Sequence, residues 1–134
     1  MYSETAISAI FPQNNGKPAF NVTLPKDQRV LTVPLSIYFF HLDFKDNHRI
    51  IFEIKNLDTN QNIKPVTFEI KGEPEYKMGP VNSQLSYNLV FNIPDNIPDK
   101  SSFALKAILQ GDQVQTTSHP MTYFDLRRTF GGWN

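Results

Sequence analysis

The chain lacks cysteine altogether, and its charges cancel. None of its 134 residues is Cys, which excludes a disulfide framework, a thiolate metal site and a cysteine nucleophile. Thirteen basic and thirteen acidic side chains give a formal net charge of zero, so the chain lacks the long-range field of a dedicated nucleic-acid binder. We therefore expect a fold held by its hydrophobic core alone, and no nucleic-acid partner.

The chain also lacks a long apolar run. The longest candidate, Leu35 to Leu42, contains Ser36 and His41 and falls far short of the roughly 20 apolar residues that a membrane-spanning helix needs. Near the N-terminus, Glu4 stands where a secretory signal carries Lys or Arg. We expect no membrane partner and no signal peptide, and a protein that is cytoplasmic, or virion-associated if it derives from a phage.

Catalytic motifs are missing as well. The chain contains no G-x-S-x-G nucleophile turn and no glycine-rich phosphate loop. Ser118 and His119 are adjacent, so their side chains point to opposite faces of a strand. Carboxylates without a supporting cleft are typical of solvated loops. We predict that the protein is not an enzyme and needs no cofactor; the only acid–base candidates are Asp43, Asp46, Glu73 and Glu75.

Segments in which apolar and polar residues alternate are, by contrast, abundant in the chain. Hydrophobic residues make up 40% of it and aromatic residues 13%, which suffices for one core in a single domain. The segment RIIFEIKNLDTNQNIKPVTFEI, from Arg49 to Ile70, has two alternating runs joined by a polar connection, and it predicts a β-hairpin. Its inward faces are expected to carry Ile50, Phe52 and Ile54 on one strand and Val66, Phe68 and Ile70 on the other.

Similar runs predict strands along most of the chain. The run from Val30 to His41 is apolar on both faces and contains Pro34, which predicts a bulge, an edge, or a bend where the strand passes between sheets. Residues Glu73 to Ser83 contain two Pro and one Gly and predict a loop. The other predicted strands are Thr5 to Phe11, Phe20 to Leu24, Gln84 to Ile93, Phe103 to Gln110, Gln113 to Thr117 and Met121 to Leu126.

Short strands at this spacing, without a sustained helical period, predict an all-β fold. An antiparallel β-sandwich is the preferred architecture, and a small β-barrel is the alternative. In the stretch SSFALKAILQGDQVQTTSHPMTY a turn at Gly111-Asp112 predicts a second hairpin. This stretch resembles the closing hairpin of many immunoglobulin-like domains, where an inward aromatic residue begins the strand and a glycine turn precedes a polar return. The resemblance implies architecture only, because the Cys pair and central Trp of antibody domains are absent.

One polar cluster has the spacing of a calcium-binding loop. Asp58, Asn60 and Asn62 are followed by Glu69, eleven residues after Asp58, which matches the oxygen ligands of a helix-loop-helix site. Ile63, however, stands where that loop requires glycine, and both flanks predict strand instead of helix. Polar side chains that cap a turn explain the same residues, so we predict no calcium site.

A second polar cluster surrounds the expected charged turn between two strands. It contains His41, Asp43, Asp46 and His48. A transition-metal site needs three or four converging ligands with oriented supporting groups. Two histidines that flank a turn do not supply these, so we predict no metal at this cluster either.

The last eight residues, RRTFGGWN, are predicted to form a tail, residues 127–134, after a single domain of residues 1–126. Arg and Trp dominate binding hot spots, and a flexible segment can order on a partner. In one interpretation, Arg127, Arg128, Phe130 and Trp133 contact a protein partner. In the other, Phe130 and Trp133 fold back over a sheet edge of their own domain.

Abundant strand without catalytic chemistry favours a protein–protein interaction or assembly module. Its partner would be another protein or a second copy, bound at sheet edges and at the tail. A structural protein of a phage or mobile element, such as a baseplate or tail accessory domain, is one alternative. Another is a carbohydrate or small-ligand binder whose aromatic platform would use Tyr38, Phe40, Tyr76 or Tyr87.

Overall fold

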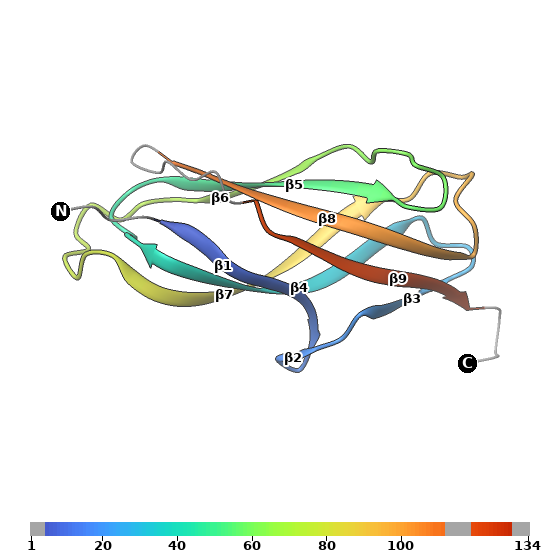
Figure 1. The fold of residues 1–134 in the computed structure, drawn as a ribbon, viewed down its shortest axis with the longest axis horizontal. Coiled ribbons are helices and arrows are strands. Elements are labelled where there is room, and N and C mark those ends of the chain that lie inside the picture. The colour runs from blue at the N-terminus through green and yellow to red at the C-terminus, as the bar shows by residue number, and fades with distance from the viewer. Residues whose placement is uncertain (1–4, 112–118, 130–134) are drawn as a thin grey trace.

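Two packed β-sheets make up the protein in the computed structural model, which describes residues 5–111 and 119–129 (Figure 1). The sheets have the strand orders β2-β1-β4-β7 and β3-β9-β8-β5-β6. No ladder joins the two sheets within these residues, so the sandwich is confirmed over the barrel. The strands are β1 (Ala6–Asn14), β2 (Lys17–Pro18), β3 (Asn21–Pro25), β4 (Val30–Leu42), β5 (His48–Asn56), β6 (Val66–Ile70), β7 (Val81–Asn92), β8 (Lys100–Gly111) and β9 (Met121–Thr129).

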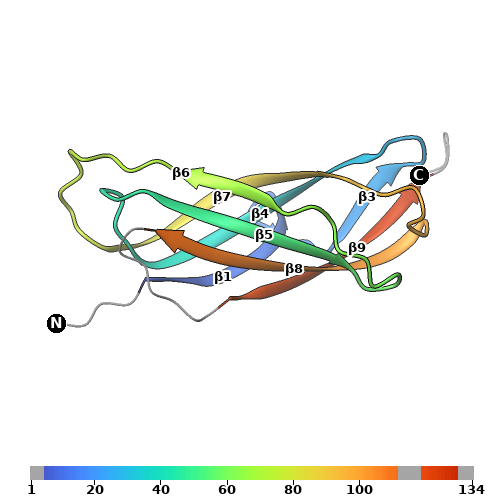
Figure 2. The same cartoon turned by 90° about the horizontal axis from the view of Figure 1, so that it is seen from above.

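The strands run roughly along the long axis of the molecule, with one sheet facing the other (Figures 1 and 2). Period-two alternation points one apolar row of each strand into the space between the sheets. Phe103 lies at the centre of this core, fully buried, with its ring stacked on Phe124 at 5.2 Å and edge-on to Phe91 at 6.1 Å. The described residues contain no helix long and apolar enough to cross a bilayer.

The predicted Arg49–Ile70 hairpin is confirmed. β5 pairs antiparallel with β6, and Ile50 lies opposite Phe68. Asn56 ends β5 and organises the connection, because its buried side-chain oxygen accepts hydrogen bonds from the backbone N–H groups of Asp58 and Thr59 at 3.0 and 2.8 Å. The polar connection is therefore a capped turn, as local side-chain-to-backbone bonding favours.

β4 remains in one sheet along its whole length, so the bend between sheets, one of the three alternatives predicted at Pro34, is wrong. β4 is a central strand between β1 and β7. Pro34 lies one residue beyond the last β1 pair, Pro12 opposite Leu35, so β4 has a strand neighbour on only one side there. The irregularity instead lies near His41, where the β7 register shifts and φ is 54°. The double-sided hydrophobicity reflects aromatic side chains on the outer face, with Tyr38 and Phe40 both exposed.

Several predicted strand boundaries differ from the structure. β1 continues to Asn14, because a two-residue turn with positive φ at Asn15 and Gly16 pairs it with β2. β7 begins at Val81, inside the segment predicted to be a loop. The predicted strand Gln113–Thr117 lies outside the described residues, and β8 pairs with β9.

Residues 6–25 contribute strands to both sheets. β1 pairs with β4 in one sheet, while β3 pairs in parallel with β9 in the other, from Asn21 opposite Asp125 to Pro25 opposite Thr129. Because β9 continues to Thr129, the predicted domain boundary after Leu126 falls within a strand.

Candidate interaction surfaces

β7 is a long edge strand. It runs for 12 residues and pairs with β4 along one side only. β6 lies beside it but belongs to the other sheet, so it forms no ladder with β7 (Figure 2). One side of the β7 backbone is consequently free to hydrogen-bond with another strand.

The backbone groups on that free side can be identified. Ile93 N–H donates to the Arg29 carbonyl at 2.7 Å and continues the register in which Val30 lies opposite Asn92. In an antiparallel ladder, the N–H and C=O of successive residues point alternately to the two sides of the strand. The odd-numbered residues of β7 therefore face β4, and the residues that face the free edge are Asn82, Gln84, Ser86, Asn88, Val90 and Asn92.

The free edge of β7 has none of the usual protection against pairing. Natural edge strands are short or carry charges, prolines or bulges. β7 reads VNSQLSYNLVFN, without a charged residue, Pro or Gly, and its register with β4 is unbroken from Ser83 to Asn92. Among the described strands, the other sheet edges are protected: β6 has five residues including Glu69, β3 has five and ends in Pro25, and β2 has two. β1, which β2 covers only at Gln13 and Asn14, carries a register shift after Ile7 and contains Pro12.

Apolar side chains lie on the inner face of β7, next to its free edge. Tyr87 is only partly buried, and its ring stacks on Phe68 of β6 at 4.3 Å and on Phe52 of β5 at 5.5 Å. A groove of about 540 Å³ lies between residues 61–66 and residues 90–94. A strand added to β7 would thus meet both free backbone groups and apolar surface.

The predicted aromatic platform is only partly assembled. Tyr38 and Phe40 point outward from β4, each 39% exposed, and Phe11 of β1 stacks on Tyr38 at 5.9 Å. Tyr87 packs between the sheets and Tyr76 packs edge-on to Phe44 at 5.7 Å, so neither joins the other two.

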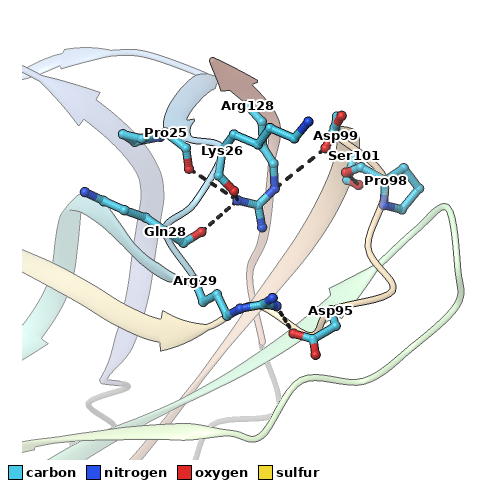
Figure 3. A network of polar contacts seen from close by, with 9 residues as sticks. All are labelled: Pro25, Lys26, Gln28, Arg29, Asp95, Pro98, Asp99, Ser101 and Arg128. Carbon is cyan, nitrogen blue, oxygen red and sulfur yellow. Dashed lines mark hydrogen bonds and ion pairs between the residues drawn. The ribbon is translucent and has the colours of Figure 1, made fainter. Parts of the chain in front are cut away.

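The structure places Arg127 and Arg128 in β9, with opposite roles. Arg127 points outward and is exposed, beside a polar hollow of about 240 Å³ that Asp58 and Asp125 also line. Arg128 lies between two loops, with its side chain only 8% exposed (Figure 3). Phe130 and Trp133, the other predicted contact residues, lie outside the described residues.

Arg128 joins these loops through its guanidinium group. Its Nη1 lies within hydrogen-bond distance of the carbonyls of Pro25, Lys26 and Gln28, at 3.3, 3.0 and 2.7 Å. Its Nε lies 3.9 Å from the Asp99 carboxylate, and its backbone N–H donates to the Asp99 carbonyl. Arg29 and Asp95 form a second, exposed ion pair between the same loops (Figure 3). The Arg128 side chain is therefore committed to its own domain.

The two predicted polar clusters do not converge on a metal-binding geometry. His48 is buried, and its Nε2–H donates to the Asp43 carbonyl at 2.9 Å. Asp58 uses a carboxylate oxygen to accept a hydrogen bond from the Ser102 N–H, whereas Glu69 lies in β6 opposite Arg49. Within residues 5–111 and 119–129, no three His, Asp or Glu side chains are grouped closely enough to hold a metal ion.

Comparison with known proteins identifies the fold and no family. No protein-family model and no curated protein matches the chain. Among solved structures it is similar to a bacterial adhesin from Mobiluncus mulieris containing intramolecular disulfide, isopeptide and ester bond cross-links. The TM-score is 0.58 with 7% sequence identity over 96% of this chain and 59% of the adhesin chain. The periplasmic chaperone SfaE also matches, with a TM-score of 0.42 and 18% identity over 82% of this chain and 54% of the chaperone.

The chain thus spans less than two thirds of the length of either matched structure. At these identities the likeness concerns the fold alone, and it confirms an immunoglobulin-like β-sandwich.

Proposed function

We propose that the protein is a non-enzymatic interaction module that binds an extended segment of a protein partner along β7. The observation that supports this proposal is the free edge of β7, which is 12 residues long and contains no charged residue, Pro or Gly. Proteins protect such edges against unwanted pairing, so an edge left unprotected over this length is explained by a strand that pairs with it.

Recognition at this edge would combine two contributions. The outward N–H and C=O groups of alternate residues supply main-chain hydrogen bonds, which give affinity with little dependence on partner sequence. Cross-strand side-chain contacts supply selectivity, each contributing about 0.2–1 kcal/mol. Leu85 and Tyr87, half-buried on the inner face, offer apolar contacts to a partner residue at the same level.

A peptide-display experiment on the full chain tests this function. Displayed libraries of random 12-residue peptides are selected on the immobilised protein, and affinities of enriched peptides are then measured against variants. Asn88→Pro removes an N–H that faces the free edge and leaves the β4 ladder intact, so we expect it to weaken binding about tenfold or more.

The matched control is Thr32→Lys, on the same outer face but on β4, one strand away from the edge. It should leave peptide affinity unchanged, and circular dichroism should show that both variants are folded. Enriched peptides that bind the Asn88→Pro variant as tightly as the wild type would contradict a β7 site, as would the failure of any peptide to bind.

A second candidate function, carbohydrate binding, is favoured by the outward pair Tyr38 and Phe40. Exposed rings on a flat sheet face, next to the amides of Asn82 and Gln84, combine apolar faces with hydrogen-bonding groups. On a glycan array, any signal of the wild type should disappear in the Tyr38→Ala/Phe40→Ala variant. It should persist in Tyr123→Ala, which removes an exposed ring from the other sheet.

The other functional expectations remain predictions. These are a phage or mobile-element origin, a cytoplasmic or virion location, the absence of enzymatic activity, and a contact role for Arg127, Arg128, Phe130 and Trp133. Among the four residues, Arg127 is the one that the described structure presents outward.

A further inference from the structure

We propose that the strand bound at β7 is β7 of a second copy, paired antiparallel across a two-fold axis at Ser86. This inference rests on the proposed function and names its partner. An isologous dimer of this kind joins two four-stranded sheets into one continuous sheet, β2-β1-β4-β7-β7-β4-β1-β2.

Charge is the first argument for a second copy. A two-fold axis through β7 places the strand against itself, so a charge near the axis would lie close to the same charge on the other copy. β7 carries none, and the formal net charge of the whole chain is zero, so copies do not repel one another at long range. A partner selected by charge complementarity would find no charge on this strand.

The alternation of the two faces limits the possible registers. The copies can pair only if outward residues meet outward residues, because a shift by one residue would turn the inner face of one copy to the solvent. With Ser86 on the axis, the polar outer pairs are Ser86 with Ser86 and Gln84 with Asn88. On the inner face, Leu85 meets Tyr87, so the half-buried apolar side chains of each copy cover those of the other.

The pairing also matches the backbone. Ser86, Gln84 and Asn88 are among the residues whose N–H and C=O face the free edge. In an antiparallel ladder, directly opposite residues of this type exchange both of their main-chain hydrogen bonds. The Ser86 register therefore uses the free groups on both copies and leaves each β4 ladder unchanged.

The neighbouring register, with Tyr87 on the axis, is less favourable. Polar–apolar pairs do not separate the two registers, because each contains one on each face: Gln84–Val90 and Ser83–Phe91 with Tyr87 on the axis, and Asn82–Val90 and Ser83–Leu89 with Ser86 on the axis. The Tyr87 register would, however, bring the two Tyr87 rings together, although each already stacks on Phe52 and Phe68. The Ser86 register avoids this meeting of the two rings, because Tyr87 then lies opposite Leu85.

The absence of cysteine permits a direct test of this register. Directly opposite residues of the hydrogen-bonded type have Cα atoms about 5.5 Å apart, which is within the range for a disulfide. We expect mild oxidation of the Ser86→Cys variant to yield a covalent dimer. The control Thr32→Cys, on the same outer face but one strand inward, should remain monomeric on a non-reducing gel.

Sedimentation of the untagged chain over a concentration series tests the dimer itself. We expect a reversible dimer in the wild type and an increase in its dissociation constant of about tenfold or more in Ser86→Lys, because two lysines then face each other. Thr32→Lys should dimerise like the wild type. Circular dichroism of each variant excludes misfolding as the cause.

The outcomes separate this inference from the proposed function. A wild-type chain that stays monomeric while selected peptides still bind β7 overturns the dimer and leaves the proposed function standing. A dimer that Ser86→Lys does not weaken overturns the β7 interface, and a dimer that Ser86→Cys does not cross-link overturns the Ser86 register. Loss of both self-association and peptide binding contradicts both proposals.

Discussion

Adjacent arginines in β9 illustrate how strongly the role of one residue depends on the fold. The sequence offers Arg127 and Arg128 as an equivalent pair, and we predicted a contact role for both. In the structure, alternation along β9 sends Arg127 outward and Arg128 toward the carbonyls of residues 25–28. No local signal distinguishes them, because those carbonyls lie about a hundred residues away and reach Arg128 only through the β3–β9 pairing.

The buried guanidinium of Arg128 gives a prediction at the residue scale. Arg128→Ala should lower the free energy of unfolding by about 1.5–3 kcal/mol, because the carbonyls of the loop at residues 25–28 lose their charged donor. Arg127→Ala, the exposed neighbour, should change it by no more than about 0.5 kcal/mol. Chemical denaturation of the three proteins measures the difference, and equal effects of the two substitutions would refute the role of Arg128.

Among the elements, β9 gives a prediction about where the domain ends. The sequence predicted a boundary after Leu126, but residues 127–129 belong to β9 and pair with Thr23, Leu24 and Pro25 of β3. A chain that ends at Thr129 should keep the melting temperature of the full chain. A chain that ends at Leu126 should melt at least about 8 °C lower, because it loses these pairs and Arg128. Calorimetry of both truncations measures this difference, and similar melting temperatures would support the boundary after Leu126.

The end of β9 at Thr129 also shows how the predicted contact role of the tail, residues 127–134, should be tested. Deleting residues 127–134 would remove part of a strand together with Phe130 and Trp133, so lost binding would not identify the cause. The chain that ends at Thr129 removes only residues 130–134 and keeps the described fold intact. Binding measured on that chain therefore isolates the predicted contact residues Phe130 and Trp133.

Elements that form from neighbouring sequence were predictable, and those set by distant sequence were not. The β5–β6 hairpin follows from alternation and from the Asn-rich turn, both of which lie within the segment itself. The apolar outer face of β4 left a bend between sheets among the predicted alternatives, because alternation cannot tell a strand that changes sheets from one that exposes Tyr38 and Phe40. β7 was recognised as a half-buried strand from its alternating sequence.

For the whole molecule, the short alternating runs without a helical period predicted the all-β class, but no sequence feature predicted the strand order. The candidate interaction surface depends on that order. The absence of charge, Pro and Gly from residues 81–92 can be read in the sequence, yet it has a consequence only because β7 lies at an edge. Inside the sheet, the same uncharged sequence would be unremarkable. Which strand lies at the edge is decided by pairings between distant segments, such as β4 with β7.

The parallel pairing of β3 with β9 determines when the fold can be completed during synthesis. Asn21 meets Asp125, so β3 emerges from the ribosome long before its partner strand exists. At typical elongation rates of roughly 5–20 residues per second, β3 waits on the order of 5–20 s. During that time β3 presents an unpaired strand edge, and β8 presents another from its own synthesis until β9 pairs with it. The nascent chain therefore exposes more unpaired strand edges than the folded protein, in whose described residues β7 is the long edge without charge, Pro or Gly.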